Sequence, residues 1–286
     1  MQVNSGEKTW RIIDSGICDA AYAMALDEAI ATAVRAGASR PTLRLYDWTT
    51  SSVSIGAFQK ISDVDTEYCT TRGIPVVRRP TGGRAILHGD EITLSFSSTC
   101  EKPFSRDLMD TYRLLGGVFR EFFRRLDLDV EIIEQRDHGT ARSRNPLCFS
   151  SLSPGELRCR GRKVMGAAQR RWGDGFLQQA TIPLTPDRET AIRVFSLPNL
   201  SGVQGPAGLR ELVPHIRRRD VKTLLTASFE AAFTVILEES PPSPQEEELA
   251  HRLALEKYLD PRWTLRGERG GRSSDSMRDS MQASQY

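Results

Sequence analysis

Strand-like runs that follow one another through short turns constrain the fold of this chain more than any other feature. Residues 42–46 and 92–98 alternate polar and apolar side chains, and residues 52–55, 75–78 and 84–87 add shorter runs between them. Because strands outnumber strand–helix–strand alternation and several follow one another through short turns, these runs favour a mixed, largely antiparallel sheet over a parallel one. An α+β fold is therefore expected, with helices packed outside the sheet.

The helices of that fold are predicted from apolar residues at helical spacing. Residues 20–34 (AAYAMALDEAIATAV) also consist almost entirely of strong helix formers. Further helices are expected at residues 63–72, 108–126, 187–195, 222–237 and 245–258, and further strands at residues 130–133, 156–160, 163–170 and 175–183. Residues 1–265 are expected to form one domain, and residues 266–286, rich in Gly, Arg, Ser and Asp, a disordered tail.

Charge and cysteine content exclude several classes of protein. With 39 basic and 37 acidic residues, the chain has no net field that would attract nucleic acid or an anionic membrane. No apolar run approaches the roughly 18 residues of a membrane helix, and residues 1–11 lack a signal-peptide core. A cytoplasmic protein is therefore expected. Its five cysteines include no CxxC pair and form no cluster with the four histidines, so neither a disulfide scaffold nor a zinc site is expected.

The segment RRPTGGRAILH, residues 78–88, is the first candidate site. Arg78 and Arg79 end a predicted strand, and Gly82 and Gly83 form a turn before the next strand. Glycines let the backbone approach a ligand closely, and arginines suit an anionic or carbonyl-bearing ligand. An ordinary hairpin with exposed arginines would show the same pattern, because Gly-Gly hairpins are common. His88 fits either a general base or a hydrogen-bonded turn histidine.

Two further segments carry candidate residues. In GRKVMGAAQRR, residues 161–171, Lys163 starts an apolar strand, and the small residues after it leave room for a narrow ligand such as an alkyl chain. The alternative is an edge strand whose lysine is solvated. Cys148 lies in the loop PLCFSS, residues 146–151, where a buried structural cysteine is the alternative to a nucleophile. Cys159 is expected to be structural.

Together these segments resemble the lipoate ligase and octanoyltransferase branch of the biotin/lipoate protein ligase superfamily. That family carries RRxTGGxAxxH followed by a GxKxxGxAQxR strand, and this chain matches both in order. MALDEA at 24–29, LRLYDW at 43–48, SIGAFQ at 54–59 and ALEKYLDPRW at 254–263 extend the similarity to roughly residues 10–265.

The resemblance implies a biotin/lipoate protein ligase-like catalytic domain with a tunnel for an octanoyl or lipoyl chain. Lys163 would contact the acyl carbonyl. The residues that the resemblance implies for substrate binding are Arg78, Arg79, Thr81, Gly82, Gly83, His88, Gly166 and Ala168. The partners it implies are octanoyl acyl carrier protein as donor and a lipoyl domain or glycine cleavage H-type protein as acceptor.

The residues before Lys163 distinguish the two chemistries of this family. Ligases have an Asn-Asp pair there and use ATP and magnesium, whereas this chain reads CFSSLSPGELRCRGRK. Cys148 and Phe149 resemble the nucleophile loop of cysteine-dependent octanoyltransferases of the Gram-positive type. A thiolate can move an acyl group from a thioester to an amine without ATP, so we expect Cys148 and Lys163 to be catalytic, with no metal or cofactor. An ATP-dependent ligase and a non-catalytic carrier-binding module remain the alternatives.

One position departs from the family pattern. Relatives end the strand after the lysine motif with a His-Gly pair, as in LQHGS, whereas this chain has Gln179 and Ala180. The missing histidine weakens any role for that position and indicates an altered substrate or a reduced activity.

Overall fold

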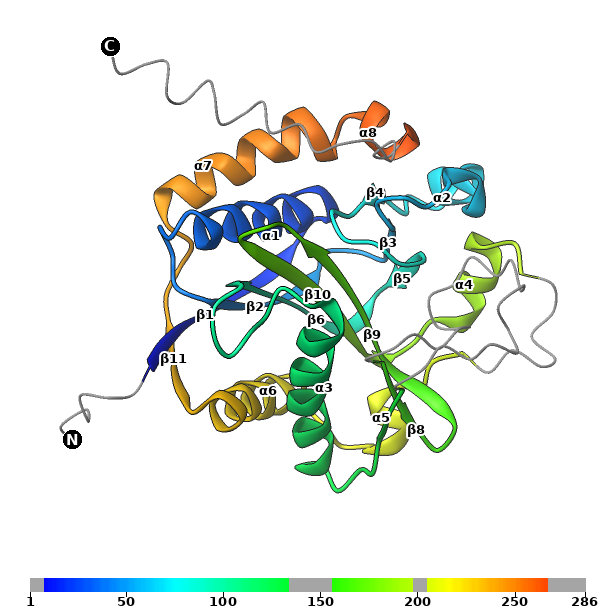
Figure 1. Ribbon diagram of the computed structural model, residues 1–286. Coiled ribbons are helices and arrows are strands. Elements are labelled where there is room, and N and C mark those ends of the chain that lie inside the picture. Colours follow the sequence, from blue (N-terminus) through cyan, green and yellow to red (C-terminus); the bar gives the residue numbers. More distant parts are fainter. Residues whose placement is uncertain (1–7, 134–155, 198–204, 267–286) are drawn as a thin grey trace, which may run out of the picture.

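The computed structural model describes residues 8–133, 156–197 and 205–266, and a mixed sheet lies at its centre (Figure 1). The strand order in this sheet is β11-β1-β2-β6-β10-β9-β8-β7. The bounds of these strands are β1 Lys8–Cys18, β2 Thr42–Trp48, β6 Asp90–Thr99, β7 Glu131–Ile132, β8 Leu157–Cys159, β9 Arg162–Arg171, β10 Gly175–Thr185 and β11 Val235–Glu239. The pairs β1–β2 and β1–β11 are parallel and the others are antiparallel, which confirms the predicted α+β fold.

A smaller sheet carries the Gly-Gly turn. In this sheet β3 (Ser52–Ile55) lies between β4 (Val76–Arg78) and β5 (Ile86–His88), parallel to the first and antiparallel to the second. The turn connects β4 to β5, so both of its ends are fixed by pairing with β3. The predicted hairpin-like arrangement therefore contains a third strand between its two arms, because the β4 and β5 backbones hydrogen-bond to β3 and not to each other.

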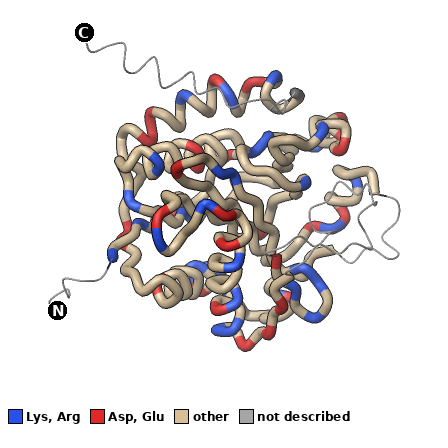
Figure 2. The backbone as a smooth tube through the Cα atoms, in the orientation of Figure 1, with Lys and Arg blue, Asp and Glu red and all other residues tan. Residues whose placement is uncertain are grey.

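Helices cover both faces of the large sheet, with α1 and α7 on one side and α3 and α6 on the other (Figure 1). The α-helices are α1 Ala20–Arg35, α2 Thr66–Thr71, α3 Leu108–Arg124, α4 Arg188–Val194, α5 Leu209–Leu212, α6 Arg218–Phe233, α7 Pro244–Leu253 and α8 Pro261–Arg266, with a 3₁₀ turn at Ile61–Asp63 and a π-helical turn at Ala254–Tyr258. Alanines of α1 pack on the sheet, where small side chains allow close approach. Basic and acidic residues are interspersed over the outer elements (Figure 2). None of the described helices is long and apolar enough to cross a membrane.

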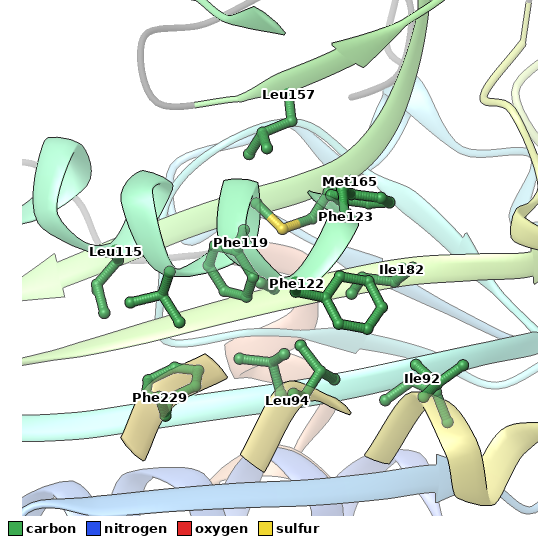
Figure 3. Packing of buried hydrophobic residues seen from close by; sticks show 14 of the residues in the cluster. Ile92, Leu94, Leu115, Phe119, Phe122, Phe123, Leu157, Met165, Ile182 and Phe229 are labelled. Atoms are coloured by element: carbon green, nitrogen blue, oxygen red, sulfur yellow. The ribbon is translucent and has the colours of Figure 1, made fainter. Parts of the chain in front are cut away.

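The core under α3 and α6 is rich in phenylalanine. Phe119, Phe122 and Phe123 of α3 pack against Leu94 of β6 and Phe229 of α6 (Figure 3). All five side chains are at most 1% exposed. Fully burying one such side chain stabilises the fold by roughly 1.5–3 kcal/mol, so this layer holds both helices against the sheet.

Two parts of the predicted secondary structure are wrong. The helix expected over residues 222–237 ends at Phe233, because Thr234 takes a left-handed conformation (φ 51°) and residues 235–239 pair with β1 as a parallel strand. Strand β1 itself was not predicted. Both errors have one cause, since β1 and β11 are held by partners far away in sequence, which local propensity does not show.

A buried ion pair joins α1 to the sheet. Asp27 of α1 is 0% exposed, and one of its oxygens lies 2.6 Å from Nη1 of Arg44 on β2. Arg44 also donates to the carbonyl of Ala23 and to the hydroxyl of Ser15. Opposite charges buried at this distance are stable only as a pair, because each would be costly to bury alone.

We expect Arg44→Leu to lower the free energy of unfolding by about 3–5 kcal/mol, because it leaves Asp27 buried without its counter-ion. Arg40→Leu is the matched control, since Arg40 pairs with Glu238 at the surface, and it should cost less than about 1 kcal/mol. Urea denaturation of the two variants measures the difference. Equal losses would show that the buried pair is not a main support of α1.

Candidate functional site

Arg79 holds the Gly-Gly turn in shape. Its Nη2 donates to the carbonyls of Gly82 (2.6 Å) and Arg84 (2.8 Å), and its Nη1 donates to the carbonyl (3.0 Å) and the hydroxyl (3.1 Å) of Ser54. Gly83 adopts a φ of +88°, a conformation that favours glycine, and a Cβ there would lie 2.9 Å from Nη2 of Arg79. The turn is therefore fixed to β3 by a single buried guanidinium.

A narrow cavity of about 20 Å³ lies beside this turn. Its free inner surface is almost entirely apolar, and Gly166, Ala167 and Ala168 of β9 form one wall. The other lining residues are Met24, Tyr46, Ser54, Arg79, Ile86, His88, Thr93, Gln179, Ala180 and Thr181. This volume holds about one water molecule, so a larger ligand enters only if lining side chains move.

Four of the predicted binding residues line this cavity, namely Arg79, His88, Gly166 and Ala168. Arg78 does not. Its guanidinium donates to the carbonyls of Gly56 (2.7 Å), Gln59 (2.6 Å) and Thr264 (2.7 Å), so it ties the turn to α8. Gly82 and Gly83 form the turn to which Arg79 donates hydrogen bonds. Thr81 does not line the cavity itself, but its hydroxyl donates to a residue that does.

That lining residue is Gln179, where the family pattern has histidine. Its amide nitrogen donates to Asp27 (2.7 Å), and its amide oxygen accepts from the Thr81 hydroxyl (2.7 Å). Asp27 also accepts from Tyr46 and Ser95. Gln179 therefore occupies the cavity wall with both ends of its amide hydrogen-bonded, and these two bonds set the orientation of its side chain.

His88 is held by a buried carboxylate that the sequence analysis did not identify. Its Nδ1 lies 2.6 Å from Glu91 and its Nε2 lies 2.7 Å from the Ser54 hydroxyl. Trp48 stacks on the ring with centroids 4.0 Å apart and also donates to Glu91. Nδ1 of His88 therefore faces the Glu91 carboxylate, and Nε2 faces the Ser54 hydroxyl. This geometry at the end of β5 fits a general base as well as a hydrogen-bonded turn histidine.

Two opposing effects act on the pKa of Glu91. Burial disfavours its charge, but the attraction of His88 and hydrogen bonds from His88 and Thr93 outweigh burial and lower the pKa of the Glu91 carboxyl. The sequence signal for this residue was its position three residues after His88, near the start of a strand whose residues 92–99 are apolar or hydroxylic.

Lys163 also has a buried acidic partner. Its ammonium lies 2.5 Å from Glu156, and both residues are 3% exposed. A buried lysine without a counter-ion tends to lose its proton, so this carboxylate favours the charged form of Lys163. Glu156 was not identified from the sequence, although it stands out as the acidic residue just before the short strand β8.

Cys148, the predicted nucleophile, lies outside the described residues. Of the cysteines that the structure describes, Cys18, Cys69 and Cys159 are buried and Cys100 is partly exposed. Burial raises the pKa of the Cys18 and Cys159 thiols and that of Cys69 to about 11, which makes these three poor nucleophiles near neutral pH. In residues 8–133, 156–197 and 205–266, no three His, Cys, Asp or Glu side chains are grouped to hold a metal.

We expect Glu91→Gln to lower the free energy of unfolding at pH 7 by roughly 2 kcal/mol, because charge-assisted hydrogen bonds are lost. The folded-state pKa of Glu91 is depressed, so its contribution is complete above the unfolded value of about 4.3 and disappears as pH falls through the folded value. Urea denaturation from pH 7 to pH 3 should show wild type and variant converging at the acid end. A difference that stays constant with pH would contradict this role.

Comparison with known proteins identifies the family of this chain. Residues 19–237 match the model of the lipoyl protein ligase A/B catalytic domain. The octanoyltransferase LipM of Halalkalibacterium halodurans is 34% identical over 91% of this chain and 99% of its own length. The octanoyltransferase LipM of Bacillus subtilis is 30% identical over the same shares.

Two solved structures of similar fold are lipoate-protein ligases. A lipoate-protein ligase A bound with ATP superposes with a TM-score of 0.77 at 24% identity, covering 90% of this chain and 98% of that one. A bi-partite lipoate protein ligase from Thermoplasma acidophilum, studied with its E2 lipoyl domain, gives 0.75 at 22% identity, covering 93% and 100%. These structures confirm the fold, and the sequence matches go further: the chain belongs to the lipoyl protein ligase A/B catalytic-domain family.

Proposed function

We propose that this chain is an octanoyltransferase of lipoate biosynthesis. It takes an octanoyl group from acyl carrier protein, holds it as a thioester on Cys148 and passes it to a lysine of a lipoyl domain or an H-type carrier protein. Its similarity to several LipM octanoyltransferases along almost their whole length supports the transfer of octanoyl groups. The E2 lipoyl domain named with the Thermoplasma ligase supports a lipoyl domain as acceptor.

The apolar cavity beside the Gly-Gly turn is the observation that carries this proposal. Its wall of Gly166, Ala167 and Ala168 suits a narrow alkyl chain, and burying each methylene contributes about 0.8 kcal/mol. The chain needs more volume than the cavity offers in this conformation. Met24 lines it with an unbranched thioether side chain, the kind of side chain that adapts most readily to a ligand.

The reaction proceeds in two acyl transfers. In the first, the Cys148 thiolate attacks the thioester carbonyl, and the carrier leaves as a thiolate that takes up the proton which Cys148 gave up on ionising. In the second, the neutral amine of the acceptor lysine attacks the new thioester, an amide forms, and the proton lost by the amine passes to the departing Cys148 sulfur. Each step develops negative charge on the carbonyl oxygen. Lys163, kept charged by Glu156, stabilises this charge, an effect of the kind that is typically worth about 3–4 kcal/mol.

A lipoate-protein ligase that uses ATP is the second candidate. The observation in its favour is the fold shared with ligases, one of them with ATP bound. Because a fold is compatible with several chemistries, this likeness does not decide between a ligase and a transferase. The two activities differ in their source of energy. A thioester donor is already activated, whereas a free acid needs ATP.

We expect Gly83→Val to slow octanoyl transfer by about tenfold or more, because a branched side chain would displace Arg79 from the turn. Gly37→Val is the matched control, since Gly37 also has a positive φ (+73°) but nothing lies within 4 Å of its Cβ position. Rates are measured with octanoyl and shorter acyl donors. If the two variants behave alike, backbone strain explains the effect and contact with Arg79 does not.

Octanoyl transfer through Cys148 is tested by intact-mass analysis with octanoyl acyl carrier protein and no ATP. The wild type should gain one octanoyl group that hydroxylamine removes, and it should then modify an apo lipoyl domain. Cys148→Ala should lose both properties, whereas Cys100→Ala, which removes a partly exposed described thiol, should keep them. Modification of the lipoyl domain only with free octanoate or lipoate and ATP would identify a ligase. Full transfer by Cys148→Ala would exclude this cysteine.

A further inference from the structure

Almost every polar side chain that lines the cavity already has hydrogen-bond partners. Tyr46 and Gln179 bond to Asp27, and Arg79 bonds to backbone carbonyls and to Ser54. Ser54 and His88 bond to each other, and Thr93 donates to Glu91. None of these groups needs a ligand as a hydrogen-bond partner. Thr181, which also lines the cavity, differs from them in this respect.

The hydroxyl of Thr181 is buried and makes no hydrogen bond with any residue in the described part of the chain. The residue is 1% exposed and lines the cavity from the middle of β10. It lies close enough to Glu91 to help lower the pKa of that carboxyl, but without the geometry of a hydrogen bond. Unpaired buried hydroxyls are rare in folded proteins and need an explanation.

The neighbours of Thr181 leave space for a ligand atom. In the strand register Thr181 stands opposite Gly166 of β9 on one side and Thr93 of β6 on the other. Gly166 has no Cβ, so the wall opposite the hydroxyl is open on that side. A group bound there meets one hydroxyl with an unused proton, among surfaces that are otherwise apolar or saturated.

We propose that Thr181 donates a hydrogen bond to the carbonyl oxygen of the bound acyl group. This inference rests on the proposed function, in which an octanoyl thioester is the ligand. Such a group has one strong hydrogen-bond acceptor, its carbonyl oxygen, and the rest of its chain is hydrocarbon. The alkyl chain then extends past Ala180 towards Gln179, which lines the same cavity. Thr181 thus binds the carbonyl oxygen of the acyl group, and the small residues of β9 accommodate its alkyl chain.

Two probes that cannot transfer an acyl group separate these roles. S-(2-oxononyl)pantetheine carries a ketone next to a heptyl chain, and S-nonylpantetheine has the same length without the oxygen. Wild type should bind the ketone more tightly. Thr181→Val removes the hydroxyl and keeps the shape, so it should weaken binding of the ketone by about tenfold, the effect of one hydrogen bond, and leave the alkyl probe unchanged. Thr181→Ser should retain the preference.

The stability of the variants provides an independent readout. Thr181→Val should cost little stability, because the hydroxyl that it removes makes no hydrogen bond of standard geometry and only helps to lower the pKa of Glu91. Thr42→Val is the matched control. It removes a buried hydroxyl that accepts from Arg11, donates to the Arg40 carbonyl and does not line the cavity, so it should destabilise the protein and leave the ratio of the two affinities unchanged.

Equal weakening of both probes by Thr181→Val, or no weakening, would overturn the proposal, as would a clear loss of stability. Because the probes bind without reacting, the result does not depend on Cys148. Failure of thioester formation with an intact ketone preference would refute the cysteine mechanism and leave the role of Thr181 standing.

Discussion

The rest of the structure depends on the hydrogen bonds and the ion pair made by the buried carboxylate of Asp27. It sits fully buried on α1 and receives hydrogen bonds from Arg44 and Tyr46 on β2, Ser95 on β6 and Gln179 on β10. One side chain thus fixes the helix to three neighbouring strands. The charge is tolerated because an arginine and several dipoles surround it, and removing one of these partners leaves part of its burial cost without compensation.

The same logic explains how a cavity lined by many polar side chains has an apolar surface. The networks around Asp27 and Glu91 use the hydrogen-bonding capacity of their members internally, and Arg79 uses its own on the Gly-Gly turn. What these groups present to the cavity is mostly carbon. An alkyl ligand therefore does not strip water from unsatisfied groups when it binds, which keeps the cost of binding low. Thr181 is the exception, because its hydroxyl is the one buried polar group of this lining that has no hydrogen-bond partner among the described residues.

The fold by itself does not determine the chemistry of the site. Ligases share it at less than 25% identity, whereas the LipM octanoyltransferases are similar along nearly the whole chain. In our proposal the chemistry differs through a few residues, with Cys148 as the nucleophile and Lys163, paired with Glu156, as the positive charge that faces the acyl carbonyl. Because a fold is compatible with several chemistries, such a difference does not require a different fold.

The sequence alone determined the elements with local signals. Helix α1, strands β3 and β10 and the Gly-Gly turn follow from propensity, period and glycine, and motif order was sufficient to indicate the family. Tertiary structure alone decided which polar residues meet. Arg78 and Arg79 are adjacent in sequence, yet Arg78 binds α8 and Arg79 binds the turn. Glu91, Glu156 and the partners of Gln179 acquire their roles only through strand pairing between distant residues, because burial and hydrogen-bond partners are properties of the packed chain and have no local signature.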